Sequence, residues 1–252
     1  MPNNENSKDY ILEALNLSKS FGGVKALDNV DIFIKRNEIV CLLGDNGAGK
    51  STFIKVIAGV FKPDKGQIFI NGKKVFFNGP KESQRAGIET IYQDLALFNQ
   101  QDITSNLFIG REIKRFGFIL NKNKMTSLAK ETLEKTGISI KSINQLFGEL
   151  SGGQKHAVAI GRAVFLSGEP QIILMDEPTA GLGVRESNEL LNIIKELKKS
   201  TAISVMLITH NLDHAFKVAD RFVILRGGKK VAEKNIKETN QSEIVEKMIG
   251  VI

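Results

Sequence analysis

The chain contains one cysteine, Cys41, among its 252 residues. A single thiol cannot form an intrachain disulfide, so the sequence excludes a disulfide-stapled secreted domain. Cys41 lies within the apolar run Ile39–Leu43, and we expect a small buried side chain there rather than a reactive thiol.

Long apolar runs are also missing from the sequence. No segment approaches the roughly 18 apolar residues that a membrane-spanning helix needs. Residues 1–9 are polar and lack the basic head and apolar stretch of a signal peptide. We therefore expect a soluble chain in the cytoplasm, whose membrane role, if any, comes through a partner.

The charge balance is basic, with 35 Lys and Arg against 28 Asp and Glu and a net charge of +7. Such a balance raises the question of nucleic-acid binding. The lysines are scattered in short groups, however, and no aromatic residues are interleaved with them for base stacking. We therefore interpret them as a solvated surface and do not expect nucleic acid as a partner. The composition, 42% hydrophobic and 25% charged, is that of a globular domain.

The first third of the chain reads as β structure interrupted by one helix. Ile39–Leu43 is apolar throughout, as expected for a strand buried on both faces. A helix is expected over residues 50–58, ended by Gly59, and the Asn71-Gly72 pair predicts a tight β-hairpin turn. The expected strands are 10–15, 30–34, 39–43, 67–70, 73–77 and 88–92.

From residue 94 to residue 162 helical patterns replace the strands, which predicts a mostly helical inserted lobe. Beyond it strands and helices alternate, which predicts a largely parallel sheet with helices on its faces. The expected segments are strands 172–175, 204–209 and 222–225 and helices 185–199, 212–219 and 242–249. We thus expect one α/β domain over residues 8–250, with a core of 8–93 and 163–250 and a lobe of 94–162.

A phosphate-binding loop follows the buried strand. The pattern G-x-x-x-x-G-K-[ST] lets consecutive backbone N–H groups converge on phosphate oxygens at the positive end of a helix. Its lysine reaches the β- and γ-phosphates, and its hydroxyl is offered to Mg²⁺. The alternative, an ordinary glycine-rich turn, lacks the strand and helix context seen here. The residues expected to bind are Gly44, Asp45, Asn46, Gly47, Ala48, Gly49, Lys50, Ser51 and Thr52.

Two adjacent carboxylates end the apolar strand at residues 172–175. Asp176 is expected to hold the Mg²⁺ shell, and Glu177 to orient and deprotonate an attacking water. His210 ends a further strand, and we expect it at the same sheet edge, near the γ-phosphate. His156 and His214 fall inside helical stretches and are interpreted as structural.

A second anion-binding pattern lies about a hundred residues after the first. Ser151 is expected to cap the helix over residues 155–165, with Gly152 and Gly153 exposing amides at its positive end before Gln154. One nucleotide does not need two cradles. The pattern makes sense if two copies dock head to tail, each lending this cradle to ATP on the other's phosphate loop.

These motifs, in this order, resemble the ATP-binding cassette family over residues 10–250. The resemblance implies a P-loop NTPase fold, an ATP-sandwich homodimer, and ATP and Mg²⁺ as ligands. It also implies that Gln93 contributes to the Mg²⁺ site and links it to the lobe, and that Phe21 stacks on adenine. The alternative for Phe21 is a core aromatic.

The segments 92–97, 106–112 and 177–184 are similar to ATPase subunits of bacterial monosaccharide importers, especially the single-cassette type of ribose, xylose or fructose systems. This implies a membrane permease, fed by a sugar-binding protein, as partner, and a location on the inner face of the cell membrane. The permease and the binding protein set the sugar. Two departures concern coupling across the dimer and contact with the partner's nucleotide. Gly183 replaces a frequent aspartate, and Lys155-His156-Ala157 replaces a Gln/Arg-rich run.

Two other functions are open from the sequence. One is a soluble cassette ATPase of an assembly or repair complex, although repair types usually carry long coiled-coil or zinc insertions for which this chain has no room. The other is a regulatory nucleotide-binding module without catalysis, which the presence of Glu177 and His210 disfavours.

Overall fold

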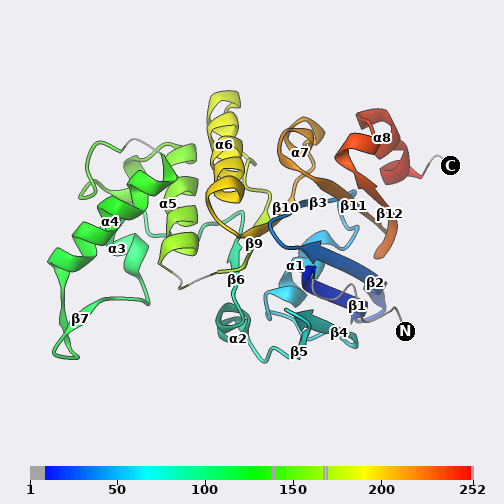
Figure 1. The fold of residues 1–252 in the computed structure, drawn as a ribbon, viewed down its shortest axis with the longest axis horizontal. Helices are drawn as coiled ribbons and strands as arrows, with labels where there is room; N and C mark the ends of the chain where they lie inside the picture. The colour runs from blue at the N-terminus through cyan, green and yellow to red at the C-terminus, as the bar shows by residue number, and fades with distance from the viewer. Residues whose placement is uncertain (1–8, 138–139, 167, 169, 251–252) are drawn as a thin grey trace.

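The computed structural model describes residues 9–137, 140–166, 168 and 170–250 (Figure 1). The expected start of the domain at residue 8 lies outside these residues, as does nearly all of the segment compared with a signal peptide. No helix among the described residues is both long and apolar enough to cross a bilayer.

An antiparallel sheet forms the N-terminal part of the fold, with strand order β2-β1-β4-β5. β1 (Tyr10–Phe21) and β2 (Val24–Lys35) are longer than the alternation predicts. The reason is a set of register shifts, with Asn16 and Asn29 at φ 51° and 55°, which interrupts the period of two. The strands β4 (Lys65–Ile70) and β5 (Lys73–Val75) form the expected hairpin, although β5 ends two residues earlier.

The second sheet has the order β12-β11-β3-β10-β9-β6 and is parallel except for the edge strand β12. The parallel sheet is therefore confirmed. Because these strands run in one direction, the carboxyl ends of β3, β10, β9 and β6 lie side by side at one edge. The strands are β3 (Ile39–Leu43), β6 (Ile88–Ile91), β9 (Ile172–Asp176), β10 (Ser204–Ile208), β11 (Arg221–Arg226) and β12 (Lys229–Asn235).

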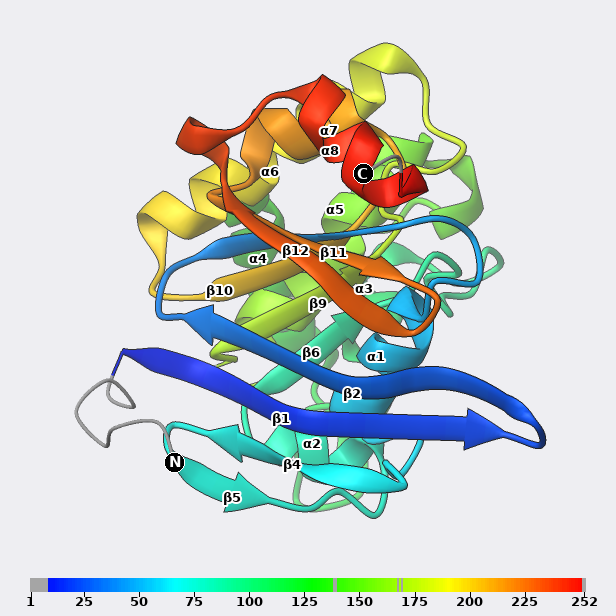
Figure 2. The ribbon, with the colours of Figure 1, turned by 90° about the vertical axis from the view of Figure 1, so that its right-hand side faces the viewer.

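Helices cover both faces of the parallel sheet (Figure 2). The helix α1 (Lys50–Ile57) lies between the two sheets, where Phe53 and Ile54 are fully buried in a shared apolar core. The opposite face is covered by α5 (Gly152–Phe165), α6 (Val184–Ser200), α7 (Leu212–Val218) and α8 (Gln241–Ile249). α2 (Pro80–Arg85) packs beside β6.

The segment expected to be a lobe contains α3 (Ile103–Phe108), α4 (Lys122–Thr136) and most of α5, around a separate apolar cluster. It also contains an unexpected two-stranded hairpin of β7 (Lys114–Arg115) and β8 (Ile119–Leu120). The boundary expected at 162/163 falls inside α5, which packs Val158 into the lobe cluster and Ala157 and Ile160 against the sheet. Short 3₁₀ helices occupy Phe147–Glu149 and Ile236–Glu238.

Cys41 lies in the middle of β3 and is fully buried. Burial, followed by the charge of Asp220, raises the pKa of its thiol well above the ordinary range. The expectation of an unreactive core residue is confirmed.

Arg221 joins three strands and one turn at the amino-terminal edge of the sheet. Its guanidinium donates two hydrogen bonds to Glu38, at 2.7 and 2.9 Å, one to Glu233 at 2.6 Å and one to the carbonyl of Phe33 at 2.7 Å. Its side chain is only 12% exposed. The residue therefore ties β2 and the turn before β3 to β11 and β12.

Candidate active site

The predicted site residues gather at the carboxyl edge of the parallel sheet. The phosphate loop follows β3, His210 lies two residues past the end of β10, Asp176 ends β9, and Gln93 lies two residues past β6. These strands are neighbours in the sheet, so the topology brings together segments that are more than a hundred residues apart in the chain. The expected position of His210 at the same sheet edge as Asp176 agrees with the neighbouring places of β10 and β9, whereas the sequence did not predict the full strand order.

The backbone of the phosphate loop has a shape that only glycine accommodates. Gly44 has φ 146°, and a Cβ there would lie 2.2 Å from the carbonyl oxygen of Leu225. Gly49 has φ 104°, and a Cβ there would lie 2.4 Å from the carbonyl oxygen of Ala26. The loop is thus pressed against β11 and β2, and its amides are held at the start of α1.

Lys50 is folded back onto this loop. Its Nζ donates to the carbonyl oxygens of Gly44 at 2.6 Å and Asp45 at 2.9 Å. Burial lowers the pKa of the amine, while the charges of Glu177, Asp176 and Asp45 oppose that shift. The ammonium therefore sits in the curve of the loop, surrounded by acceptors, where a phosphate could replace the carbonyls.

The side chains of Ser51 and Asp176 face each other, with Oγ and Oδ1 3.5 Å apart. Burial raises the pKa of Asp176, and Ser51 counteracts this. One hydroxyl and one carboxylate suit Mg²⁺, which is typically held by one or two protein oxygens together with substrate phosphates. Among the described residues no group of three or more His, Cys, Asp or Glu could hold a metal.

Glu177 and His210 are in contact. Glu177 Oε2 lies 3.0 Å from Nδ1 of His210 and accepts a long hydrogen bond of 3.4 Å from its backbone N–H. Glu177 has φ 51°, a sparsely populated conformation for a residue with a Cβ, and its N–H donates to the carbonyl of Ile208 at 3.0 Å. The backbone strain turns the carboxylate of Glu177 away from the line of β9 and toward β10.

Gln93 and Phe21 both lie on the surface. Gln93 is exposed directly after β6. Phe21 ends β1 with 43% of its surface exposed, and its ring packs edge-on against Phe61 at 5.0 Å between centroids. The alternative of a core aromatic is therefore wrong for Phe21, whose ring also lies 5.5 Å from the Nζ of Lys19.

The start of α5 has the cap expected from its sequence. Ser151 Oγ accepts from the N–H of Gln154 at 3.3 Å, and Gln154 Oε1 accepts from the N–H of Ser151 at 3.0 Å. A Cβ at Gly152 would lie 2.3 Å from Leu182, so the start of α5 is pressed against the loop that precedes α6. Figure 1 shows α5 beside α6, on the side of the sheet away from α1.

Two residues of this region were not expected from the sequence. Glu186, on the first turn of α6, accepts from the N–H of Gly183 at 3.3 Å. That bond, then the Ser151 hydroxyl and the amides of Gly153 and Gly152, lower its pKa. His214 was interpreted as structural, and its Nδ1 lies 3.0 Å from Thr179 Oγ1, a contact with the loop after Glu177 that the sequence did not predict. The sequence did contain local signals for both residues. Glu186 comes three residues after the N-cap Gly183 of α6, and His214 lies in the first turn of α7.

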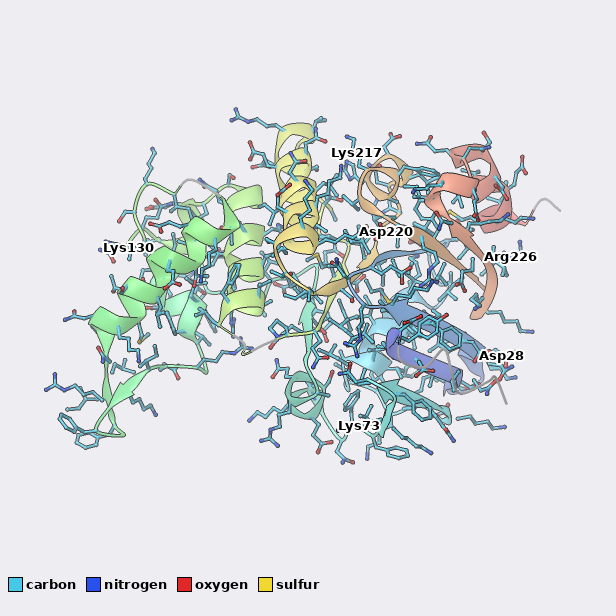
Figure 3. All side chains as sticks on the ribbon, viewed as in Figure 1. Asp28, Lys73, Lys130, Lys217, Asp220 and Arg226 are labelled. Atoms are coloured by element: carbon cyan, nitrogen blue, oxygen red, sulfur yellow. The ribbon has the colours of Figure 1, made fainter. Side chains whose placement is uncertain are left out.

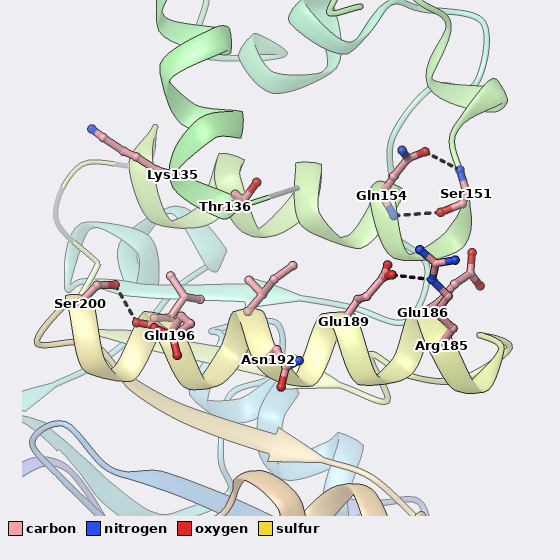
Figure 4. Close-up of a pocket in the computed structure, with 13 residues that line it drawn as sticks. Lys135, Thr136, Ser151, Gln154, Arg185, Glu186, Glu189, Asn192, Glu196 and Ser200 are labelled. Carbon is pink, nitrogen blue, oxygen red and sulfur yellow. Dashed lines mark hydrogen bonds and ion pairs between the residues drawn. The ribbon is translucent and has the colours of Figure 1, made fainter. Parts of the chain in front are cut away.

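A groove of about 810 Å³ runs between α5 and α6 and reaches the end of α4 (Figure 4). Ser151 and Gln154 line one end and Ser200 the other. The phosphate loop does not line this groove, so we do not assign the groove to the nucleotide.

The arrangement can bind a triphosphate and hydrolyse it. A curved run of amides and an ammonium suit phosphates, a hydroxyl and a carboxylate suit a divalent ion, and a strained glutamate beside a histidine suits a water. The basic residues Lys73, Lys130 and Lys217 lie on separate elements, β5, α4 and α7 (Figure 3).

Comparison with known proteins supports this chemistry. The profile of the ABC transporter family matches residues 27–180. The xylose/arabinose import ATP-binding protein XylG of Sulfolobus acidocaldarius is 49% identical over 238 residues, 94% of this chain and 93% of that protein. The fructose import ATP-binding protein FrcA of Rhizobium meliloti is 41% identical over 251 residues, 97% of this chain and 95% of that protein.

Solved structures agree in fold. A nucleotide-free ATP-binding cassette from an ABC transporter superposes with a TM-score of 0.82 at 30% identity, covering 96% of this chain and 95% of that one. A dimeric post-hydrolysis cassette bound to ADP and phosphate gives a TM-score of 0.73 at 26% identity, covering 90% of this chain and 100% of that one.

Proposed function

This chain belongs to the ABC transporter family and is an ATP-hydrolysing cassette, and from that premise we propose that it powers uptake of a monosaccharide through a membrane permease. The observation that carries the ATPase part is the row of phosphate loop, Glu177–His210 pair and Asp176 along one sheet edge. The sugar part is supported by the import functions named for the two relatives, which this chain matches over nearly their full length. An assembly or repair ATPase is not favoured by these relatives.

In the proposed hydrolysis, ATP lies with its phosphates over residues 44–52 and its adenine against Phe21. Lys50 leaves the carbonyls of Gly44 and Asp45 and pairs with the β- and γ-phosphates. Water attacks the γ-phosphorus, the bond to the oxygen bridging the β- and γ-phosphorus breaks, and ADP and phosphate are released. Glu177 takes the proton of the water, and His210 holds the glutamate and contacts the γ-phosphate.

Ser51 and Asp176 would hold Mg²⁺, with Gln93 reaching the same site from the end of β6. The ion, when bound, neutralises negative charge on the phosphate oxygens. Because this chain supplies few oxygen ligands for the ion, the phosphates are needed to complete its coordination. We therefore expect the metal and the nucleotide to bind together.

The cradle made by Ser151, Gly152, Gly153 and Gln154 serves the ATP of a second copy. Dimeric cassettes among the structural relatives support such an assembly. The permease then holds the dimer at the inner face of the membrane, and a sugar-binding protein acts on the far side of that permease.

The test is ATPase activity in proteoliposomes that contain this chain and the membrane permease with which it co-purifies. We expect turnover to rise when one of a panel of sugar-loaded binding proteins is added, and ATP to drive sugar into the vesicles. The matched control is Lys50→Ala, which should lose MgATP binding and both activities because the phosphates lose their ammonium. Full ATPase activity in that variant would refute the phosphate-loop assignment, and ATPase activity without any sugar dependence would refute the transport assignment.

A further inference from the structure

The hairpin of β7 and β8 is the most exposed apolar feature of the lobe. All seven residues from 114 to 120 are exposed. Phe116 is 74% exposed, Phe118 78%, Ile119 51% and Leu120 44%. Large apolar side chains exposed singly are ordinary, but four adjacent ones on one short ribbon mark a contact surface.

The backbone keeps these rings outward at a cost. Phe116 has φ 54°, a conformation in which a bulky side chain is a genuine outlier. Gly117 follows at φ 83°, so the turn reverses within three residues and places Phe116 and Phe118 on either side of it. A turn of glycine and polar residues would avoid both the unfavourable φ of Phe116 and the exposure of apolar surface. Because the two rings are exposed, packing within the chain does not explain why phenylalanine occupies these positions.

Basic residues flank the two phenylalanines in the sequence. Four exposed basic residues lie in the hairpin or within four residues of its end: Lys114, Arg115, Lys122 and Lys124. The guanidinium of Arg115 lies 5.0 Å from the centroid of the Phe116 ring. The nearest acidic residue in sequence is Glu112, whose carboxylate accepts from the N–H of Gly110. Residues 114–120, Lys-Arg-Phe-Gly-Phe-Ile-Leu, contain no acidic or amide side chain.

The hairpin stands at one extreme of the molecule. Figure 1 shows β7 at the end of the lobe opposite α8, projecting beyond α3 and α4. Within the described part of the chain, β7 and β8 pair with each other and with no further strand, through Lys114–Leu120 and Arg115–Ile119. It is a convex tip that a flat surface can meet without reshaping the lobe.

We propose that the tip of the β7–β8 hairpin inserts into the headgroup region of a membrane that carries anionic lipids. Aromatic and aliphatic side chains flanked by Lys and Arg are the combination that binds at this depth, with rings at the acyl boundary and cations at the phosphates. A protein groove is the competing occupant. The lipid surface is favoured because the tip offers apolar area and positive charge, the complement of an anionic membrane, while residues 114–120 contain no acidic or amide side chain that could pair with a protein groove. This contact requires neither permease nor nucleotide and so goes beyond the proposed function.

The test is co-sedimentation of the purified chain with vesicles of phosphatidylcholine, alone or with about one third phosphatidylglycerol. We expect the partition coefficient to be about tenfold or more higher with the anionic lipid, and to fall at high salt because screening weakens the attraction. The double variant Phe116→Ser with Phe118→Ser should lose about tenfold in binding to the anionic vesicles, since the apolar anchors are removed.

The matched control is Phe76→Ser. Phe76 is 73% exposed with Lys74 Nζ 5.1 Å from its ring centroid, but it lies outside the hairpin, and its removal should leave vesicle binding unchanged. ATPase activity and melting temperature should be those of the wild type in both variants. The proposal is overturned if the wild type does not bind anionic vesicles, or if the double variant binds them as well as Phe76→Ser does. A double variant that keeps vesicle binding but no longer co-purifies with the permease would assign the tip to a protein surface instead.

Discussion

Glu177 carries a conformational cost that its neighbours do not. Its positive φ and its hydrogen bond from the backbone of His210 place the carboxylate across the ends of two strands. Strain of this kind costs roughly 1–3 kcal/mol and is retained where geometry matters more than stability. The charge of this carboxylate acts on Lys50 of the phosphate loop, so the strain supports a catalytic role more strongly than the Asp-Glu sequence does.

His156 is a residue through which acid should act on stability. It is buried on α5, and its Nδ1 lies 3.0 Å from the carbonyl oxygen of Gly152. Burial lowers its pKa, although Gly152 and Glu186 oppose the shift. The folded state therefore favours the neutral ring, and below the ordinary pKa of about 6.5 the unfolded chain binds protons more readily. Stability should be full above that pH and should be lost as the pH falls toward the folded pKa.

The corresponding variant is His156→Gln. We expect its melting temperature to drop less than that of the wild type between pH 7.5 and pH 5.5, values that bracket the ordinary histidine pKa of about 6.5. Thermal unfolding followed by circular dichroism at both pH values measures this. Equal drops in the two proteins would show that the buried imidazole does not govern the acid response.

At the scale of secondary-structure elements, we expect replacement of Arg221 to lower the free energy of unfolding. Its four hydrogen bonds connect β2, the turn before β3, β11 and β12, and its partner Glu38 also accepts from the N–H of Lys35 at 2.8 Å. Removing one member of such a pair leaves the other charge buried without compensation. For Arg221→Met we expect a loss of about 3 kcal/mol in the free energy of unfolding.

Urea denaturation measures this loss. Arg185→Met is a fitting comparison, because Arg185 also pairs with a glutamate but its side chain is 92% exposed. That variant should unfold at the wild-type urea midpoint. An Arg221 variant with the same midpoint as Arg185→Met would mean that the ion pairs do not hold these strands together.

The elements that the sequence predicted well are those whose pattern has one cause. Ile39–Leu43 is apolar because both faces of β3 are covered, and Asn71-Gly72 turns because both residues adopt positive φ. β12 was missed because its charged residues are typical of a loop. As an edge strand, β12 needs only one covered face and can carry charged side chains on the other. The β7–β8 hairpin was missed because two paired residues per strand leave no period to detect.

The site was predictable in its members but not in its contacts. Lys50, Ser51 and Asp176 could be named because phosphate and Mg²⁺ chemistry requires those residue types at fixed spacing. The positive φ of Glu177, the contact of Phe21 with Phe61 and the approach of Glu186 to the start of α5 depend on long-range packing. No local pattern encodes such packing.

For the whole molecule, the central prediction is that the working unit contains two chains. Glu177→Gln should bind MgATP, hydrolyse it at least about a hundredfold more slowly because the base is lost, and accumulate as a dimer. Sedimentation velocity with MgATP and with MgADP measures this, and we expect monomers with MgADP.

The dimer should depend on the start of α5. Adding Ser151→Ala to Glu177→Gln should weaken the MgATP-bound dimer, because the hydroxyl that we propose contacts the partner's nucleotide is lost. Adding Ser200→Ala, at the other end of the same groove, should not. If both double variants dimerise as the parent does, Ser151 takes no part in the interface.

The burial of Cys41 makes the protein convenient for chemical labelling. Because the single native thiol is buried in β3, maleimide dyes and spin labels should not react with the folded chain. Cysteines introduced on the lobe or on α6 would then be the sole attachment points, with no need to build a cysteine-free background. Fluorophore pairs on those two elements could follow the lobe relative to the sheet during each turnover. Slow labelling of the native thiol would report how often the central strand opens.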